Sequence, residues 1–305
     1  MKQLNRNIYI KLMSLLFSAL SNVAVSADFY VKEDNVAGAG YAIHINGEIQ
    51  KGDMKEYISI VNRRSTFPEL IKISSPGGDV VEAVKIGRLV RRGHTKVLPV
   101  STCNSSCALI VFGGTRNLQR GDIGLHRPYY DKSYFSNLGR NEAEAQYDKL
   151  TEYIRSYMEE MDVPNVVADK MFTVSSGDIY KISMEQYRGL AGEYPPAYHE
   201  WLKAKCGMLK KGEREDLEKV FALKNYTRYQ GWKDSELKHD LLTEYEALAM
   251  KGMKLPEGYR AYLVKKNKKF SQCKREAIEK DRQLLMSGMF FDDLSNTEPE
   301  FLLTE

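Results

Sequence analysis

Two adjacent serines stand between two cysteines in the stretch TCNSSCALIVFGG, residues 102–114. A short apolar run follows the serines and ends at two glycines, which predicts a turn that leads into a short helix. A serine at such a turn is exposed near the positive end of a helix dipole, and it becomes a nucleophile when a nearby base takes its proton. A serine there can also simply cap the helix. The stretch therefore predicts either a nucleophile, Ser105 or Ser106, or a structural corner held by sulfur.

Two other parts of the sequence supply what a serine hydrolase needs besides the nucleophile. Pro76-Gly77-Gly78 follows an apolar strand and precedes a helix, and glycines at such a corner let backbone N–H groups turn toward a bound oxyanion. His126 follows the apolar residues IGL, at the end of another expected strand, where a base could face the serines. Together these residues predict acyl-transfer chemistry.

The elements that must hold these residues alternate along the chain. Apolar alternation and β-branched residues predict strands, helical spacing of apolar residues predicts the segments between them, and this order favours an α/β domain with a parallel sheet and covering helices. The expected strands begin at Tyr41 and lie at 69–74, 96–101 and 122–128, with helices at 52–64 and within 75–93.

The second half of the chain has a different character. Residues 129–142 show no period and predict a loop, 147–161 predict a helix, and the tripeptide at 194–196, Tyr-Pro-Pro, marks a boundary because two prolines continue neither a helix nor a central strand. The Lys/Glu-rich remainder predicts about four helices. We therefore expect an α/β domain over 28–196 and an all-α region over 197–305.

The N-terminus predicts export. Residues 1–27 carry three cations, then an apolar run of about nine residues, then a small-residue end at Ala27, which is typical of a secretory signal peptide. An uncleaved membrane anchor is the alternative, but the run is shorter than the ~20 residues that span a bilayer. We expect a mature, soluble protein from about Asp28, periplasmic or secreted.

Charge and cysteines exclude several classes of function. Without the leader, the formal charge of +4 falls to about +1, which gives no support to nucleic-acid binding. Four cysteines in an exported chain favour disulfides, and their positions predict the pairs Cys103–Cys107 and Cys206–Cys273. The five histidines lack the spacing of zinc ligands, so no metal and no cofactor is expected.

The motifs, taken together, resemble a known family. The segments IHINGEI, ISSPGGDVVEA, SSCALIVFGG, IGLHRP and GDIYKISMEQYRGLAG are similar to the proteolytic subunit of Clp protease and, more loosely, to signal-peptide peptidases, both in the Clp/crotonase superfamily. The likeness is strongest to exported Clp-like proteins of bacteria. It spans about residues 41–193 and implies a Clp/crotonase-like fold, with no counterpart for the C-terminal helices.

The resemblance assigns roles to individual residues. The family's nucleophile precedes a glycine by nine positions, and counting back from Gly114 reaches Ser105. By the same likeness, His126 is the general base, and the backbone N–H groups of Gly78 and Ser106 form the oxyanion hole. No lysine is suitably placed for a serine–lysine dyad.

The third member of the implied triad is Asp178, although it lies one residue out of register with the family pattern. Ser175 or Ser176 is the alternative group to orient the histidine. The stretch between the expected nucleophile and base is also a few residues shorter than in Clp protease, so the connecting loop must differ.

The expected function is a serine endopeptidase that acts on peptides or unfolded protein outside the cytoplasm, without the ATPase partner that feeds Clp protease. A catalytically inactive Clp-like binding or assembly module is the alternative. Acyl-CoA chemistry, as in crotonases, is disfavoured by export. Relatives assemble through the helix after the histidine strand, so the apolar stripe over 147–161 indicates either a homo-oligomer or packing on the domain's own core.

Overall fold

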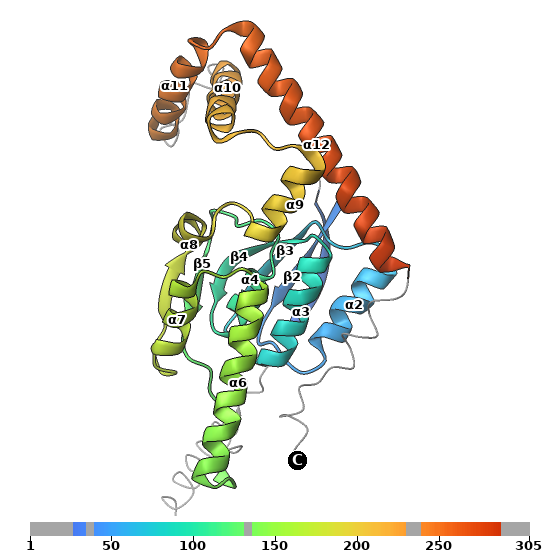
Figure 1. Cartoon of the computed structure of the whole chain (residues 1–305), viewed down its shortest axis with the longest axis vertical. Coiled ribbons are helices and arrows are strands. Elements are labelled where there is room, and N and C mark those ends of the chain that lie inside the picture. Colours follow the sequence, from blue (N-terminus) through green and yellow to red (C-terminus); the bar gives the residue numbers. More distant parts are fainter. Residues whose placement is uncertain (1–26, 35–39, 131–135, 230–238, 288–305) are drawn as a thin grey trace, which may run out of the picture. The chain divides into compact units, whose positions relative to one another are not determined.

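The computed structural model describes residues 27–34, 40–130, 136–229 and 239–287. Apart from Ala27, the expected signal peptide lies outside these residues. The chain divides into two compact units, one that ends at Pro195 and one that spans Pro196–Ser287 (Figure 1). The first unit is α/β and the second is helical.

The main sheet of the first unit has four strands in the order β1-β2-β3-β4. These strands are β1 (Asp28–Asp34), β2 (Gly40–Asn46), β3 (Leu70–Ser75) and β4 (Lys96–Cys103). The last three run parallel, with Ile43 opposite Ile71 and Ile71 opposite Val97. Alternate residues of β3 are fully buried, which explains why apolar alternation located this strand in the sequence.

Two features correct the expected all-parallel sheet. Strand β1 pairs antiparallel with β2, so the sheet is mixed. Residues 28–33 are exposed or half-buried and lack the apolar pattern that would have revealed an edge strand. The strand expected at 122–128 ends at Leu125. This strand, β5 (Asp122–Leu125), pairs antiparallel with β6 (Tyr180–Ser183) in a separate two-stranded sheet.

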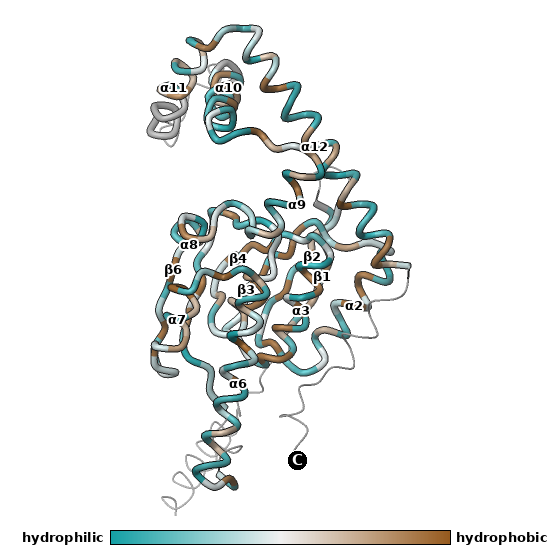
Figure 2. Tube along the Cα trace, in the orientation of Figure 1, coloured by the Kyte–Doolittle hydropathy of each residue, from teal (hydrophilic) through white to brown (hydrophobic). Residues whose placement is uncertain are grey.

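The helices of the first unit are α2 (Asp53–Arg64), α3 (Val80–Arg92), α4 (Ser106–Phe112), α6 (Arg140–Glu160), α7 (Asn165–Thr173) and α8 (Met184–Ala191). The Asp79 carboxylate caps α3 by accepting the Glu82 N–H at 2.9 Å. Hydrophobic residues gather in the sheet and in α3 (Figure 2), where Val84, Ile86 and Val90 are fully buried. This core fixes the ends of β3 and β4.

The apolar stripe over residues 147–161 lies on helix α6. Leu150, Ile154, Tyr157 and Met158 on this helix are buried within the chain itself. The Tyr157 hydroxyl donates to the carbonyl oxygen of Leu109 in α4 at 2.7 Å. The stripe therefore packs on the core of its own unit.

The second unit consists of α9 (Pro196–Cys206), α10 (Lys211–Tyr229), α11 (His239–Met253) and α12 (Glu257–Met286). Leu209, Leu217 and Leu263 form a small core there, with Val220 and Tyr259 packed against it. The predicted Cys206–Cys273 disulfide joins α9 to α12. Two disulfides in one chain fit an exported protein. Among the described residues, no helix is both long and apolar enough to cross a bilayer.

Glu213 makes the stability of the helical unit depend on pH. Its carboxylate accepts two hydrogen bonds from the Lys266 ammonium, at 2.7 and 2.8 Å, and one from the Lys210 backbone N–H. These bonds lower the pKa of Glu213 from 4.5 to about 2. A lowered pKa stabilises the folded state above the unfolded pKa, and this contribution is lost as the pH falls from about 4.5 toward 2.

We therefore expect Glu213→Gln to reduce the difference in urea stability between pH 6 and pH 3. Tryptophan fluorescence is the measurement, because Trp201 lies in α9 of the Pro196–Ser287 unit. Glu218→Gln is the control, since Glu218 is exposed and makes no recorded hydrogen bond or ion pair in the described chain. Equal pH dependence in the two variants would contradict the assignment.

Candidate active site

Three chain segments meet at one edge of the α/β unit. Strands β3 and β4 are parallel neighbours, so their carboxyl ends lie at the same edge, where ligands bind in open α/β sheets. An isolated bridge joins Asn104, just past β4, to Gly124 in β5. The Ser-Pro-Gly-Gly corner, the Ser105 turn and the segment leading to His126 are thus brought together.

Ser105 stands on a strained turn between β4 and α4. Its backbone has φ 56° and ψ −129°, a conformation that costs roughly 1–3 kcal/mol in a residue with a side chain. Its N–H donates to the Gly124 carbonyl at 2.8 Å, which holds the turn against β5. The side chain makes no capping hydrogen bond to α4. Nucleophilic serines of hydrolases commonly occupy such a strained strand-to-helix turn.

Two backbone N–H groups beside Ser105 have no acceptor in the described part of the chain. One belongs to Ser106, the first residue of α4, where an N–H has no partner within the helix. The other belongs to Gly78, at φ 135°. Ile49 fixes Gly78 from both sides: the Ile49 N–H donates to Gly77 and the Ile49 carbonyl accepts from Asp79, both at 2.8 Å. These are the two donors predicted for an oxyanion hole.

The two corners are in close contact. A Cβ atom built on Gly77 would lie 2.7 Å from the Ser105 Cβ and 3.3 Å from its Oγ. Only glycine therefore fits beside Ser105 at this position, which also has φ 112°. The Ser-Pro-Gly-Gly corner and the serine turn form one site.

His126 is buried, with 8% of its surface exposed, and follows β5 directly. Its Nδ1 lies 2.9 Å from the carbonyl oxygen of Arg127. Because a carbonyl only accepts, Nδ1 is the donor in this contact, and in the neutral ring Nε2 is then the nitrogen with the free lone pair that a general base needs. The ring also lies against Tyr129, with 5.8 Å between ring centroids.

The structure records no hydrogen bond between the Ser105 hydroxyl and His126, two residues that it fully describes. Their connection is through the backbone, since Ser105 is bonded to Gly124, two residues before His126. Catalytic hydrogen bonds are often long in a free enzyme and shorten when substrate binds. Direct proton transfer from Ser105 to His126 would need the two side chains to come closer when substrate binds.

Asp178 and its alternatives lie in the turn before β6. Strand pairing places Leu125 opposite Tyr180, and the Arg127 N–H donates to the Val174 carbonyl, so this turn lies near His126 in space. The Asp178 side chain is exposed and makes no hydrogen bond or ion pair with the described residues, and the Ser175 hydroxyl accepts the N–H of Gly177. None of the three residues, Ser176 included, bonds to His126 within the described chain. The Arg127 carbonyl holds the imidazole instead, and a triad role for Asp178 stays a prediction.

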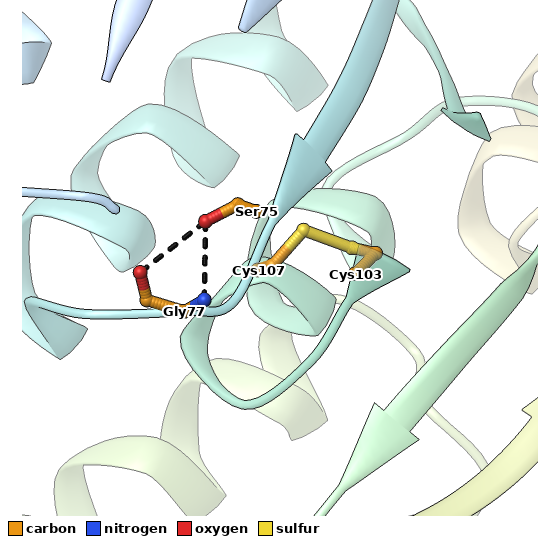
Figure 3. The surroundings of a disulfide bond; sticks show 4 residues. All are labelled: Ser75, Gly77, Cys103 and Cys107. Atoms are coloured by element: carbon orange, nitrogen blue, oxygen red, sulfur yellow. Dashed lines mark hydrogen bonds between the residues drawn. A yellow bond between two sulfur atoms is a disulfide. The ribbon is translucent and has the colours of Figure 1, made fainter. Parts of the chain in front are cut away.

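A disulfide brackets the serine turn. Cys103, the last residue of β4, is bonded to Cys107 in α4, as the sequence predicted, with 5.2 Å between their Cα atoms (Figure 3). Both cysteines are buried. The bond crosses the turn on which Ser105 stands, and so restrains the strained conformation from both sides.

Helix α4 is itself anchored in the core. The Arg91 guanidinium donates to the carbonyl oxygens of Phe112 and Gly113 at its end, at 2.9 and 3.1 Å. Tyr157 bonds to the Leu109 carbonyl, and burial raises the pKa of this hydroxyl well above its usual range, so it stays a neutral donor. These bonds fix the helix whose first N–H faces the site.

Two contributions to the site could not be identified from the sequence. Ser75 belongs to the Ser-Pro-Gly-Gly motif, but its buried hydroxyl bonds to Gly77, and only the folded turn reveals this. The Arg127 carbonyl is a backbone group, so residue type gives no sign of it. Among the described residues, no group of three His, Cys, Asp or Glu side chains is placed to hold a metal ion.

Comparison with known proteins gives no match: neither a family model nor a curated protein sequence is significantly similar to this chain. The function is therefore inferred from the chemistry of the site. Its main elements are the strained serine, the two N–H groups and the histidine whose Nδ1 lies against the Arg127 carbonyl.

Proposed function

We propose that this protein is an exported serine endopeptidase of the Clp/crotonase type that cleaves peptides or unfolded protein. The observation that carries the proposal is the turn at Ser105. A non-glycine residue is held there at positive φ, its hydroxyl does not cap the helix, and the two N–H groups predicted for the oxyanion have no protein acceptor in the described chain. A turn that only ended a strand would need none of these features.

In the proposed reaction, Ser105 Oγ attacks the carbonyl carbon of the scissile peptide bond while His126 Nε2 takes the hydroxyl proton. The negative charge that develops on the carbonyl oxygen accepts hydrogen bonds from the N–H groups of Gly78 and Ser106. The C–N bond then breaks, and the leaving amine takes the proton from His126. Water, deprotonated by His126, hydrolyses the acyl-enzyme and regenerates Ser105.

The proposed mechanism requires His126 to become positively charged when it takes the proton. As the imidazolium forms, its Nδ1–H needs an acceptor, and the Arg127 carbonyl at 2.9 Å supplies one. A carbonyl dipole stabilises the cation less than a carboxylate would. In the proposed mechanism, Asp178 moves toward His126 when substrate binds, and its carboxylate then stabilises the imidazolium.

The alternative, a catalytically inactive binding module, predicts that Ser105 caps α4. The structure gives Ser105 no such bond, whereas Asp79 and Ser183 in the same unit each accept a backbone N–H from the first turn of the helix that they cap. A strained residue whose hydroxyl does not cap the helix needs another reason to be there. Catalysis supplies that reason.

The proposed location follows from the cysteines and the N-terminal sequence. Both disulfides persist in an oxidising compartment such as the periplasm. Outside the cytoplasm there is no ATP to drive an unfoldase, and neither acyl-CoA nor nucleic acid is an expected partner. Substrates are then peptides or proteins that are already unfolded.

A fluorophosphonate probe tests the proposal directly, because it reacts with activated serines. We expect labelling of the intact protein at neutral pH, with the adduct located on Ser105 by peptide mass spectrometry. Denatured protein is the control, since an ordinary serine hydroxyl is not activated. Failure of the folded protein to react, or an adduct on Ser106 instead, would overturn the assignment of the nucleophile.

A further inference from the structure

Ser75 lies at the point where the two corners of the proposed site are tied together. It ends β3, opposite Cys103 of β4, and only 1% of its surface is exposed. Its hydroxyl bonds to Gly77 and makes no hydrogen bond to Ser105 in the described chain. Any effect it has on the reaction must act through its neighbours.

The Ser75 hydroxyl holds the Ser-Pro-Gly-Gly corner in shape. Its Oγ accepts the Gly77 N–H at 3.1 Å and donates to the Gly77 carbonyl at 3.2 Å, as drawn in Figure 3. One hydroxyl can do both, because it has one proton and two lone pairs. The Gly77 carbonyl also accepts the Ile49 N–H at 2.8 Å, so the peptide group that leads into Gly78 is fixed from two directions.

The Ser75 backbone holds the other corner. Its carbonyl accepts the N–H of Asn104 at 3.1 Å, and Asn104 is the residue before Ser105. A single buried residue therefore bonds to Gly77 with its side chain and to the serine turn with its backbone. Gly77 is also the residue whose missing side chain leaves room for Ser105.

We infer that Ser75 is a positioning residue, whose hydroxyl sets the direction of the Gly78 N–H relative to Ser105. This inference rests on the proposed function and names a residue that the proposed mechanism does not use. Without the hydroxyl, the corner keeps its glycines but loses the bonds that orient the Gly77–Gly78 peptide group. The N–H of Gly78 then points away from the oxyanion for part of the time.

Ser75→Ala tests the inference on the full-length protein. Removing an oxyanion donor lowers kcat by about 10²–10³-fold, so loosening one lowers it by roughly tenfold or more. The KM for a peptide substrate changes less than about twofold, because the donor acts mainly in the transition state. Ser75→Thr keeps the hydroxyl and is expected to restore most of kcat.

Ser74→Ala is the matched control. Ser74 is the preceding residue of β3, and its hydroxyl makes no hydrogen bond recorded in the described chain. We expect Ser74→Ala to keep the kcat of the unmodified protein. Equal losses in both alanine variants, or a Thr variant no better than Ala, would show a merely structural role and overturn the inference.

Amide hydrogen exchange separates this inference from the proposed function. Peptides covering residues 75–79 are expected to exchange faster in Ser75→Ala than in Ser74→Ala, whether or not the protein hydrolyses anything. Unchanged exchange would overturn the inference even in an active protein. A different outcome is that the unmodified protein fails to react with the fluorophosphonate while Ser75→Ala still exchanges faster than Ser74→Ala. That result would overturn the proposed function, and with it the catalytic consequence of Ser75, but not the positioning of the corner by Ser75.

Discussion

Ser105→Ala is expected to reduce hydrolysis of casein, or of a tagged unfolded peptide, to background. The substitution removes only the hydroxyl group, whose Oγ forms the bond to the acyl group in the proposed mechanism. Enzymes of this type lose about 10⁶-fold in kcat when the nucleophilic serine is removed. The measurement is the initial rate of peptide release, with the purified variant compared with the unmodified protein at equal concentration.

Ser106→Ala is the informative comparison. Alanine keeps the backbone N–H that the oxyanion hole needs, and the Ser106 hydroxyl is buried without a hydrogen-bond partner in the described structure. We therefore expect a loss that is smaller by several orders of magnitude than that of Ser105→Ala. The reverse order of effects would show that the two serines have been assigned the wrong way round.

Thermal unfolding of the Ser105 variant distinguishes catalysis from structure. A capping serine contributes about 1 kcal/mol, which alanine would remove. Ser105 makes no such bond, so the alanine variant is expected to unfold at a temperature close to that of the unmodified protein. A lowered unfolding temperature of the variant, together with no hydrolysis above background by the unmodified protein, would support the inactive-module alternative.

The sequence predicts the parts of the fold that a simple period identifies. Strand β3 and the first half of β4 alternate buried and part-exposed residues, β2 is mostly buried and apolar, and α3 has an apolar face with a capping Asp79 and a glycine at its end. These elements were located to within a few residues. Strand β1 was missed because an edge strand with charged residues has no comparable pattern.

The pairing of β5 could not be predicted from its own residues. A short apolar run fits a parallel or an antiparallel partner equally well. The choice depends on β6, more than 50 residues later, whose Ile182 lies opposite Ile123. This pairing also decides where the turn containing Asp178 lies, which explains why the residue at His126 Nδ1 was the least predictable part of the site.

More of the serine corner could be predicted from the sequence, because the residues that form it are close together along the chain. Ser105, Cys103 and Cys107 lie within five consecutive positions, and both flanking cysteines are bonded as their spacing suggested. The positive φ of Ser105 and its contact with Gly77 could not be predicted in this way. They come from the neighbouring strand β3, and no residue pattern within 102–114 specifies them.

Gly78→Ala is expected to lower kcat by about 10²–10³-fold, the loss typical of one missing oxyanion donor. A Cβ atom on Gly78 would lie 2.1 Å from the Ile49 carbonyl oxygen and 2.9 Å from its nitrogen, so the backbone must move. The same carbonyl accepts the Asp79 N–H, and its displacement rotates the peptide group that carries the Gly78 N–H. Ser105 and His126 are unchanged, so the variant should still bind peptide.

Gly52→Ala separates this geometric effect from the general cost of losing a glycine at positive φ. Gly52 has φ 105°, near the 135° of Gly78, but a Cβ there meets no atom within 4 Å. Both variants bear the strain of a side chain in a left-handed conformation, and both are expected to unfold at a lower temperature. Only Gly78→Ala displaces an oxyanion donor, so kcat measured well below the unfolding temperatures should fall in that variant alone. Similar kcat values in the two variants would show that the Gly78 N–H is not an oxyanion donor, and Ser106 would be the one proposed backbone donor left.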